Sequence, residues 1–456
     1  MTDDVHLGEP RAIHIVGIGG AGMRAIASVL SAMGHKVSGS DLKPSPAIDR
    51  LRAQGVDASV GHRASNVVGV ELLTRSTAVP NSNPEVVAAS EQGIPVWSRA
   101  EMLAAITRVR PTISVAGTHG KTTTASMLAV ILREGRLDPS FIIGGQVNEV
   151  GSGAVWAATE GWFVVEADES DGTFVELDSQ LGIVTSVEPD HLSHYGSEAD
   201  LRRAFDEFVA GVSGTTFVCA DDQGARSLAV HPDVVTYGVS PDSDWVVSGY
   251  SSRRMGASFE LRSPTGGEVE IELTTPGLHN VLNAAAAVAA ASTAGTSLEA
   301  AQRALRRFGG VARRFQLRGE RDGVTYIDDY AHLPSEVTAA LEAAKAGDWN
   351  RIICVFQPHR YTRTRDLWRD FATAFEGADS VLVTDIYGAG ETPLPGVSGE
   401  LVVESVLAVE PHASISFVAD RGDLVATLHD QLIAGDLCLT LGAGDLTTLP
   451  DEMLVP

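Results

Sequence analysis

Positive charge is scarce in this sequence of 456 residues, and lysine is the rarest basic residue. Only four lysines occur, Lys36, Lys43, Lys121 and Lys345, and the formal net charge is −25 at pH 7. Such an acidic protein is poorly suited to nucleic acid, because binding to a phosphate backbone requires a positively charged surface. An anionic ligand must therefore be bound by local arginines and by the N-termini of helices.

Cysteines and long hydrophobic runs are also few. The three cysteines, Cys219, Cys354 and Cys438, lie far apart and follow no metal-ligand spacing, which is typical of reduced core residues in a cytoplasmic protein. The most apolar long tract, Val281–Ala294, is too short to span a bilayer. The first six residues contain no apolar run, so we expect a cytoplasmic protein without a signal peptide or a membrane span.

The chain is too long for one hydrophobic core, and its 44% content of hydrophobic residues is that of a globular protein. Short apolar strands alternate with helical patterns along most of the sequence, which predicts an α/β fold. Two stretches rich in arginine or glycine, 108–111 and 309–316, mark the boundaries between three domains. We expect these domains to comprise residues 1–109, 110–311 and 312–456.

The most informative stretch is a glycine loop between a β-branched run and a helical pattern. The run from Thr112 ends in Gly117-Thr-His-Gly-Lys-Thr122, and the helical pattern covers 123–133. This order of strand, loop and helix places backbone N–H groups around phosphate oxygens, with Lys121 on the phosphates and the Thr122 hydroxyl on Mg²⁺. The match is partial, since Val115 stands where the usual loop opens with glycine, and an ordinary turn is the alternative.

A second glycine motif lies near the N-terminus. Gly17-Ile-Gly-Gly-Ala-Gly22 follows an apolar strand and opens a helix predicted over Met23–Met33, and Asp41 comes 24 residues after Gly17. This is the pattern of a Rossmann-like unit, in which an acidic residue holds a ribose. The motif alone leaves two readings open, a dinucleotide site or glycines that serve only helix packing.

Acidic residues follow two predicted strands of the central domain. Glu166 and Asp168 end one strand, and Glu188 and His191 follow the next. Because carboxylates at the carboxyl end of a parallel sheet lie beside a phosphate loop, these residues predict a site for a metal and a nucleotide. A solvated acidic loop and a structural histidine are the alternatives.

Polar motifs also accompany the later elements. Asn280 precedes the helical tract Val281–Ala294 and is either a helix cap or a ligand contact. Arg313 and Arg314 are either surface charge or an anion clamp. In the third domain the motifs 328–332, 357–363 and 442–445 fall at strand ends, the binding edge of an open parallel sheet.

Seven motifs thus follow one another along the chain: Gly17–Met23, Gly117–Thr122, Glu166–Asp171, His279–Asn280, Arg313–Gln316, Asp328–His332 and Gln357–Arg363. Together they resemble the motifs of the Mur ligases of peptidoglycan synthesis. The resemblance implies a Rossmann-like N-terminal domain for a UDP-substrate, a central P-loop ATPase-type domain with a mixed or parallel sheet, and a Rossmann-like C-terminal domain for the amino acid. It also implies an ATP-dependent ligase that uses Mg²⁺, UDP-N-acetylmuramate and L-alanine, as a monomer or homodimer.

The resemblance carries roles onto individual residues. The ATP-binding residues would be Gly117, Thr118, His119, Gly120, Lys121, Thr122, Thr123, Asn280, Arg314 and Asp329, and the metal ligands Thr122, Glu166 and His191. The substrate-binding residues would be Gly19, Gly20, Gly22, Met23, Asp41, Ser76, Tyr330, His332, Arg360 and Arg363. The catalytic residues would be Lys121, His332, Arg360 and Arg363.

One position departs from the family pattern. The family usually has a second histidine after the one at His332, and Leu333 stands there in this chain. His332 is then the candidate base that deprotonates the amine before it attacks an acyl phosphate.

Two other classes of protein stay open at this stage. A dinucleotide-dependent oxidoreductase would use Gly17–Asp41 but leaves the loop Gly117–Thr122 without a role. A nucleotide-gated binding protein would use that loop but would not need the strand-end motifs of the third domain.

Overall fold

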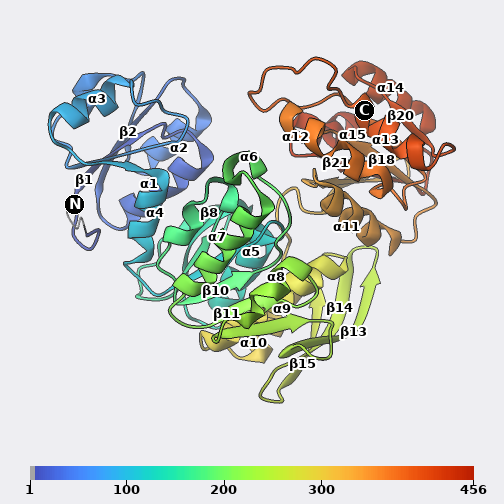
Figure 1. The fold of residues 1–456 in the computed structure, drawn as a ribbon, viewed down its shortest axis with the longest axis horizontal. Helices are drawn as coiled ribbons and strands as arrows, with labels where there is room; N and C mark the ends of the chain where they lie inside the picture. Colours follow the sequence, from blue (N-terminus) through green and yellow to red (C-terminus); the bar gives the residue numbers. More distant parts are fainter. Residues whose placement is uncertain (1–5, 456) are drawn as a thin grey trace. The chain divides into compact units, whose positions relative to one another are not determined.

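The computed structural model describes residues 6–455, whose strands form three sheets of five, ten and six strands with helices packed around them (Figure 1). The chain divides into two compact units. The first contains the residues up to Ser248 together with Glu260–Val269 and Leu282–Phe308. The second contains Gly249–Phe259, Glu270–Val281 and the residues from Gly309.

The first sheet is wholly parallel, with the order β3-β2-β1-β4-β5. Its strands are β1 Ala12–Val16, β2 Lys36–Asp41, β3 Asp57–Val60, β4 Leu72–Arg75 and β5 Val96–Ser98. Its helices are α1 Ala21–Ala32, α2 Pro46–Ala53, α3 Pro84–Glu91 and α4 Arg99–Thr107. The strand order reverses between β1 and β4, so the glycine loop after β1 lies at the point where open α/β sheets bind ligands.

The second sheet has the order β15-β14-β13-β12-β11-β10-β6-β9-β7-β8 and is mixed, because β8 runs antiparallel to β7. Its strands are β6 Thr112–Ala116, β7 Ser140–Val147, β8 Ser152–Val155, β9 Phe163–Glu166, β10 Leu181–Val184, β11 Thr216–Cys219, β12 Val234–Gly238, β13 Trp245–Arg253, β14 Gly256–Arg262 and β15 Glu268–Leu273. Its helices are α5 Lys121–Glu134, α6 Leu192–Tyr195, α7 Glu198–Gly211, α8 Gln223–Ser227, α9 Leu278–Thr293 and α10 Leu298–Arg306. Strand β6 pairs with β9 and β10, which brings both predicted acidic strand ends beside the phosphate loop.

The third sheet has the order β16-β17-β21-β18-β19-β20, parallel except for β16. Its strands are β16 Gln316–Arg321, β17 Val324–Asp329, β18 Ile352–Phe356, β19 Ser380–Val383, β20 Ile415–Phe417 and β21 Leu437–Leu441. Its helices are α11 Pro334–Lys345, α12 Tyr361–Leu367, α13 Glu400–Val409, α14 Arg421–Gln431 and α15 Leu449–Leu454. Separate buried clusters cover its two faces, with Cys354 in one and Cys438 in the other.

Several sequence predictions are corrected at element ends. Helix α1 begins at Ala21 rather than Met23, and α5 begins at Lys121, so loop residues form the first helical turns. Helix α12 is followed directly by a 3-10 helix, Trp368–Thr373. All three cysteines are buried and free, as predicted.

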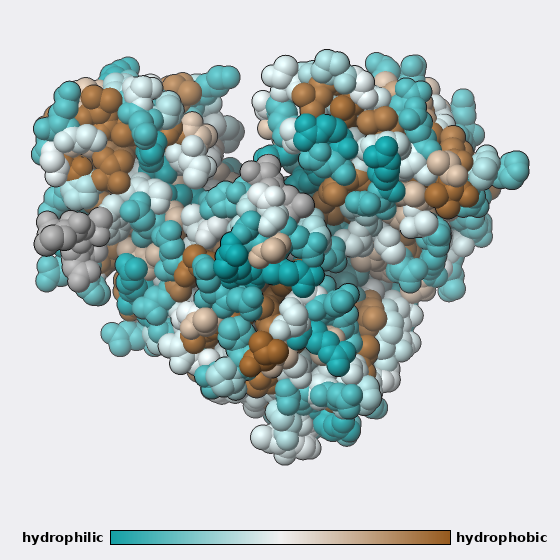
Figure 2. All heavy atoms as spheres, viewed as in Figure 1, coloured by the Kyte–Doolittle hydropathy of each residue, from teal (hydrophilic) through white to brown (hydrophobic). Residues whose placement is uncertain are grey.

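The surface shown in Figure 2 carries hydrophobic residues in several separate groups among hydrophilic ones. Exposed large hydrophobic side chains, such as Val68 and Val230, come from different elements. Within residues 6–455, no helix combines the length and the hydropathy needed to cross a membrane.

Candidate active site

The phosphate loop is shaped by two glycines that no other residue could replace without strain. Gly117 has φ of +131°, and a Cβ there would collide with Thr185 and approach the Ser186 backbone nitrogen to 3.0 Å. Gly120 has φ of +77°, caps α5, and leaves room for no side chain because Asn283 lies against it. Sequence reasoning singled out Asn280 and missed Asn283, since both belong to one helical pattern and only packing separates them.

The loop is tied to the end of β10 by side chains. The Thr118 hydroxyl donates to the Glu188 carbonyl at 3.2 Å and accepts from the Glu188 backbone N–H at 2.9 Å. His119 Nε2 lies 3.2 Å from the Glu188 carboxylate, and the His119 N–H donates to Ser186. Thr123 is buried in the first turn of α5. The loop is therefore held in one shape.

Lys121 is surrounded by carboxylates. Its Nζ lies 2.7 Å from Oε2 of the buried Glu169 and donates to the Gly117 carbonyl at 2.5 Å. Burial alone would lower the pKa of Lys121, but the charges of Glu169 and Glu166 outweigh it and raise the pKa above its ordinary value. The ammonium stays charged at neutral pH, as a phosphate ligand must.

Two of the three predicted metal ligands lie together. The Thr122 hydroxyl donates to the Glu166 carboxylate at 3.0 Å, and the Gly144 N–H donates to the same carboxylate at 2.7 Å. His191 lies 3.3 Å from Asp190 and 4.0 Å from Glu169 instead. In the described part of the chain, no three His, Cys, Asp or Glu residues converge as a ready-made metal site. The oxygens of Thr122 and Glu166 nevertheless fit Mg²⁺, which takes few protein ligands and completes its shell with water and phosphate.

The glycine loop of the first domain closes onto an acidic residue. The Gly19 N–H donates to Asp41 Oδ2 at 2.9 Å. Gly17 has φ of +80°, and a Cβ there would lie 3.0 Å from Cβ of Ser76. The predicted residues Gly19, Asp41 and Ser76 are thus neighbours of one loop.

The other predicted residues of this loop lie on the first turn of α1. Gly20 is its N-cap and has no capping side chain. A Cβ at Gly22 would lie 2.9 Å from Nη1 of Arg99. The Met23 side chain is buried, so only its backbone can face a ligand.

A cavity of about 450 Å³ extends from this loop to the phosphate-loop carboxylates. Gly22 lines it on α1, and Glu166 and Asp168 line it at the end of β9. Three arginines also line it, and the sequence analysis missed them: Arg24, Arg50 and Arg99. In a chain of net charge −25, three arginines around one cavity are the signal of an anion site.

A row of aromatic and imidazole rings marks the third domain. The His332 ring lies 5.4 Å from that of Tyr330 and 5.5 Å from that of His359, and the His359 ring stacks on Tyr387 at 5.8 Å. Arg363 Nη1 donates to His359 Nδ1 at 3.0 Å. Burial, assisted by His332 and Arg363, lowers the pKa of His359 to about 4, so His359 is neutral.

Arg360 stands out in this row by its backbone. It is exposed and has φ of +69° at the start of α12. A left-handed conformation is costly for an arginine, and such strain gathers at functional sites. Sequence reasoning named Tyr330, His332, Arg360 and Arg363. It gave no separate role to His359, which lies inside the motif 357–363, and it missed Tyr387.

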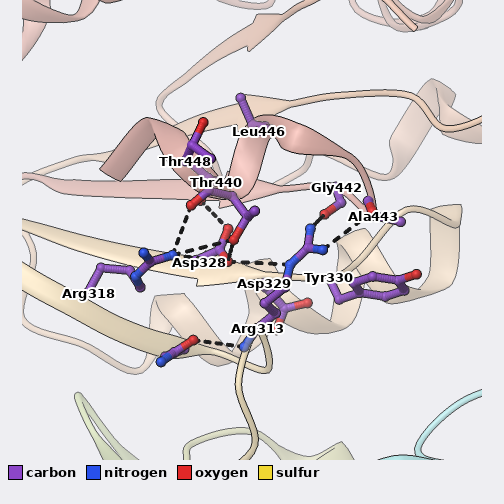
Figure 3. A network of polar contacts seen from close by, with 12 residues as sticks. Arg313, Arg318, Asp328, Asp329, Tyr330, Thr440, Gly442, Ala443, Leu446 and Thr448 are labelled. Carbon is purple, nitrogen blue, oxygen red and sulfur yellow. Dashed lines mark hydrogen bonds and ion pairs between the residues drawn. The ribbon is translucent and has the colours of Figure 1, made fainter. Parts of the chain in front are cut away.

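Arg313 and Arg314 have separate roles, and Figure 3 shows the contacts of Arg313. Arg313 Nη2 donates to the carbonyls of Gly442 and Gly444 at 2.6 and 3.0 Å, and its Nε lies 3.7 Å from Asp328. Arg313 therefore fastens the start of the third domain to the loop after β21.

Arg314 is held less tightly than Arg313. Its guanidinium carbon lies 5.1 Å from the centre of the Tyr330 ring, and its Nη1 lies 3.9 Å from Glu336. These longer contacts leave Arg314, rather than Arg313, as the candidate anion clamp.

Asp329 and Asn280 are both engaged with the backbone. Asp329 accepts from the N–H groups of Phe315 and Ala331 at 2.7 and 2.8 Å, and burial raises its pKa to about 6. The Asn280 amide donates to the Pro276 carbonyl at 2.7 Å. Their assignment to ATP stays a prediction.

Comparisons with known proteins agree with this geometry. Three family models match in succession: the catalytic domain of the Mur ligase family over residues 12–110, the Mur ligase middle domain over 115–291, and the Mur ligase, glutamate ligase domain over 313–444. The chain therefore belongs to the Mur ligase family, and the predicted family is confirmed.

Individual relatives are similar to the chain over nearly its whole length. The chain is 44% identical to a UDP-N-acetylmuramate–L-alanine ligase from Sorangium cellulosum, over 96% of this chain and 95% of the relative. It is 42% identical to the protein of the same name from Myxococcus xanthus, over 97% and 94% of the two chains. The solved structure of UDP-N-acetylmuramate-alanine ligase from Thermotoga maritima covers 97% of this chain and 98% of its own, with a TM-score of 0.79 and 30% identity. The predicted three-domain α/β fold is thereby confirmed.

Proposed function

We propose that the chain is an ATP-dependent ligase that joins L-alanine to the carboxylate of UDP-N-acetylmuramate in peptidoglycan precursor synthesis. One observation carries the proposal: the cavity of about 450 Å³ joins the glycine loop at Gly22, three arginines and the phosphate-loop carboxylate Glu166. An acidic sugar nucleotide bound there would hold its carboxylate beside a nucleotide on the phosphate loop. The names of the similar proteins supply the substrates.

The chemistry explains why the site needs a lysine on a rigid loop. A carboxylate is a poor acyl donor, so its oxygen attacks the γ-phosphate of ATP to form an acyl phosphate and ADP. Charge on the transferring phosphoryl group is stabilised mainly by positioned cations. Lys121 supplies such a cation from the first residue of α5, whose N–H groups face the same phosphates.

Mg²⁺ is part of the proposal, with Thr122 and Glu166 as its protein ligands. When bound, it would neutralise charge on the ATP phosphates. The Gly144 N–H, at 2.7 Å from Glu166, fixes the orientation of that carboxylate. His191 stays the third predicted ligand.

Arginines of the cavity would bind the anionic groups of the sugar nucleotide. Arg99 lies beside Gly22. Burial would raise the pKa of Asp168, but the charge of Lys121, hydrogen bonds from Ser170 and, last, the charge of Arg99 lower it. Arg24 and Arg50 line the same cavity from α1 and α2. Guanidinium groups match phosphate and carboxylate oxygens in pairs, which positions the muramoyl carboxylate for attack.

The third domain would supply the amine. His332 Nδ1 lies 3.0 Å from the Tyr330 carbonyl and 3.2 Å from the Glu336 carboxylate, so Nδ1 carries the proton that both oxygens accept. His332 Nε2 is then the nitrogen that can take a proton from the alanine ammonium before the amine displaces phosphate. Arg360 and Arg363 would hold the alanine carboxylate.

The remaining predictions belong to the same proposal. They are a cytoplasmic location, a monomer or homodimer, and domain boundaries after residues 109 and 311. Asn280, Arg314 and Asp329 remain predicted ATP contacts from the resemblance.

Phosphate release tests the proposal directly. The protein is incubated with MgATP, UDP-N-acetylmuramate and single amino acids, and each component is left out in turn. Release should require all three substrates and be fastest with L-alanine, and the product should be the alanyl amide by mass spectrometry. Release that does not depend on the sugar nucleotide, or product with another amino acid only, would refute it.

A further inference from the structure

The first domain contains a buried carboxylate that the proposed chemistry does not use. Glu85 is fully buried at the second position of helix α3, and its N–H is capped by Asn83 at 2.9 Å. Its Oε1 accepts from the Arg63 N–H at 3.1 Å and from the Asn66 amide at 2.5 Å. Its Oε2 accepts from the Ser40 hydroxyl at 2.5 Å.

This carboxylate is ionised. Burial would raise the pKa of Glu85, but the His14 imidazole, whose Nε2 lies 3.6 Å from Oε2, and hydrogen bonds from Ser40 and Asn66 outweigh it and lower the pKa to about 2. An ionised carboxylate only accepts hydrogen bonds. Both oxygens of Glu85 therefore impose the direction of every hydrogen bond that they make.

The hydrogen bond from Ser40 to Glu85 also fixes the direction of the hydrogen bond between Ser40 and His62. A hydroxyl group has one hydrogen, and the hydrogen of Ser40 is given to Glu85. Ser40 Oγ lies 2.8 Å from His62 Nδ1, so Oγ accepts from that nitrogen. Nδ1 of His62, which also lies 3.3 Å from Glu85 Oε2, therefore carries the proton. A neutral His62 then has an unprotonated Nε2, which is a hydrogen-bond acceptor.

The His62 ring stands at the ligand edge of the sheet. Ser40 and Asp41 end β2, and their carbonyls accept from the N–H groups of Gly17 and Gly61. The glycine loop and the loop that carries His62 are thus fixed to the same two residues. The contacts of His62 within residues 6–455 are made through Nδ1, and 10% of its side chain is exposed.

We propose that Glu85 is a positioning residue for the sugar nucleotide: through Ser40 it holds the His62 proton on Nδ1, so that Nε2 accepts a hydrogen bond from the uridine part of the substrate. Uridine offers such donors in the imide N–H of its base and the hydroxyls of its ribose. This inference rests on the proposed function for its ligand, but the imidazole tautomer depends on the protein alone.

The test compares two isosteric changes in the same domain. Glu85→Gln replaces one accepting oxygen by a donating amide. With that amide toward Ser40, the hydroxyl turns its hydrogen to His62 Nδ1, and the His62 proton moves to Nε2. Glu71→Gln is the control, because exposed Glu71 accepts from the Ala12 N–H at 2.7 Å at the opposite end of β1.

Two readouts are taken on both variants and on the unchanged protein. The tautomer is read from ¹⁵N spectra of ring-labelled histidine at about pH 9, where imidazole groups are neutral, with His62→Gln identifying the signal. UDP affinity is measured by calorimetry, and the KM for MgATP by phosphate release. Glu85→Gln should shift His62 toward the Nε2–H form and weaken UDP binding roughly tenfold or more, since a misdirected partner leaves a polar group unpaired. The KM for MgATP should stay within about twofold, the range expected of a site that is not touched.

Several results would overturn the proposal. A proton on Nε2 of His62 in the unchanged protein would do so even if Glu85→Gln failed to fold. A variant that binds UDP more weakly while keeping the Nδ1–H form would show a merely structural role. If the unchanged protein bound no UDP, the proposed function would fail, and the ligand assigned to His62 would fail with it.

Discussion

The glycine loop after β1 and the phosphate loop after β6 share the order of strand, loop and helix, but they obtain their positive charge in different ways. The phosphate loop places the Lys121 cation among the carboxylates Glu166 and Glu169. The glycine loop closes onto the Asp41 carboxylate and lies beside the arginine Arg99. One local pattern therefore serves two kinds of ligand chemistry.

The glycines that cap the helices after the two loops also differ in backbone conformation. Gly120 is left-handed, with φ of +77°, and turns the chain so that Lys121 becomes the first helical residue. Gly20 has φ of −64°, and the helix that follows it begins with Ala21. The first loop has no lysine of its own for a terminal phosphate, and arginines on α1, α2 and α4 provide the positive charge. This contrast favours a ligand with a bridging diphosphate over a nucleoside triphosphate at the first loop.

Lys121→Ala should have the largest effect, because it removes the cation that distinguishes the phosphate loop from the glycine loop. Loss of a key transition-state contact costs about 3 kcal/mol or more, which is at least a hundredfold in rate. Phosphate release should fall by that factor while the circular dichroism spectrum stays unchanged. Lys345→Ala is the matched control, since Lys345 pairs with exposed Glu342 on α11. A Lys121→Ala protein with a tenth of the normal rate would contradict the assignment.

Glu166→Gln tests the metal half of the same loop. The change keeps the shape of the side chain but removes the charge that Mg²⁺ requires. Loss of an outer-shell partner of a metal ligand lowers metal affinity by about 10–100-fold. Because Glu166 would be a direct ligand, we expect the Mg²⁺ concentration for half-maximal activity to rise by at least that factor. Glu176→Gln, in the 3-10 helix Thr173–Glu176, is the control. An unchanged Mg²⁺ requirement would remove Glu166 from the metal site.

The sequence predicted the two loops because each is a local pattern. Strand, glycine and helix lie within about a dozen residues, and the conformations of Gly117 and Gly120 follow from that short stretch. The acidic strand ends were predicted for a similar reason, because parallel strands bring their carboxyl ends to one edge.

What the sequence did not reveal depends on packing between distant elements. Arg99, at the start of α4, approaches Gly22 of α1 only in the folded chain, and an isolated arginine in a helical pattern gives no such signal. Arg313 and Arg314 are adjacent in sequence, but only the fold shows that Arg313 is engaged by the loop after β21. The left-handed backbone of Arg360 is likewise set by tertiary contacts rather than by residue type.

Arg99→Ala tests the glycine loop after β1, because it removes a cation that comes from outside that loop. A charge-assisted hydrogen bond to a ligand contributes about 1.5–3 kcal/mol, so the KM for the sugar nucleotide should rise roughly tenfold or more. The KM for MgATP should stay unchanged. Arg136→Ala is the control, as Arg136 lies just after α5 and does not line the cavity. An equal rise of both KM values would instead indicate damage to the central domain.

Asp41→Asn should have the smallest effect of the four. Asparagine can still accept from the Gly19 N–H through its amide oxygen, so the loop keeps its shape. The substitution weakens only the bond that a charged acceptor would make to a ribose hydroxyl, and charged hydrogen bonds are about twice as strong as neutral ones. UDP affinity should therefore fall by only a few-fold, with no change in the KM for MgATP. Asp57→Asn, at the exposed amino end of β3, provides the control in calorimetry. If Asp41→Asn abolished UDP binding while the melting temperature fell as well, Asp41 would be a support of the loop rather than a ligand contact. The two glycine loops would then differ in their supply of cations alone.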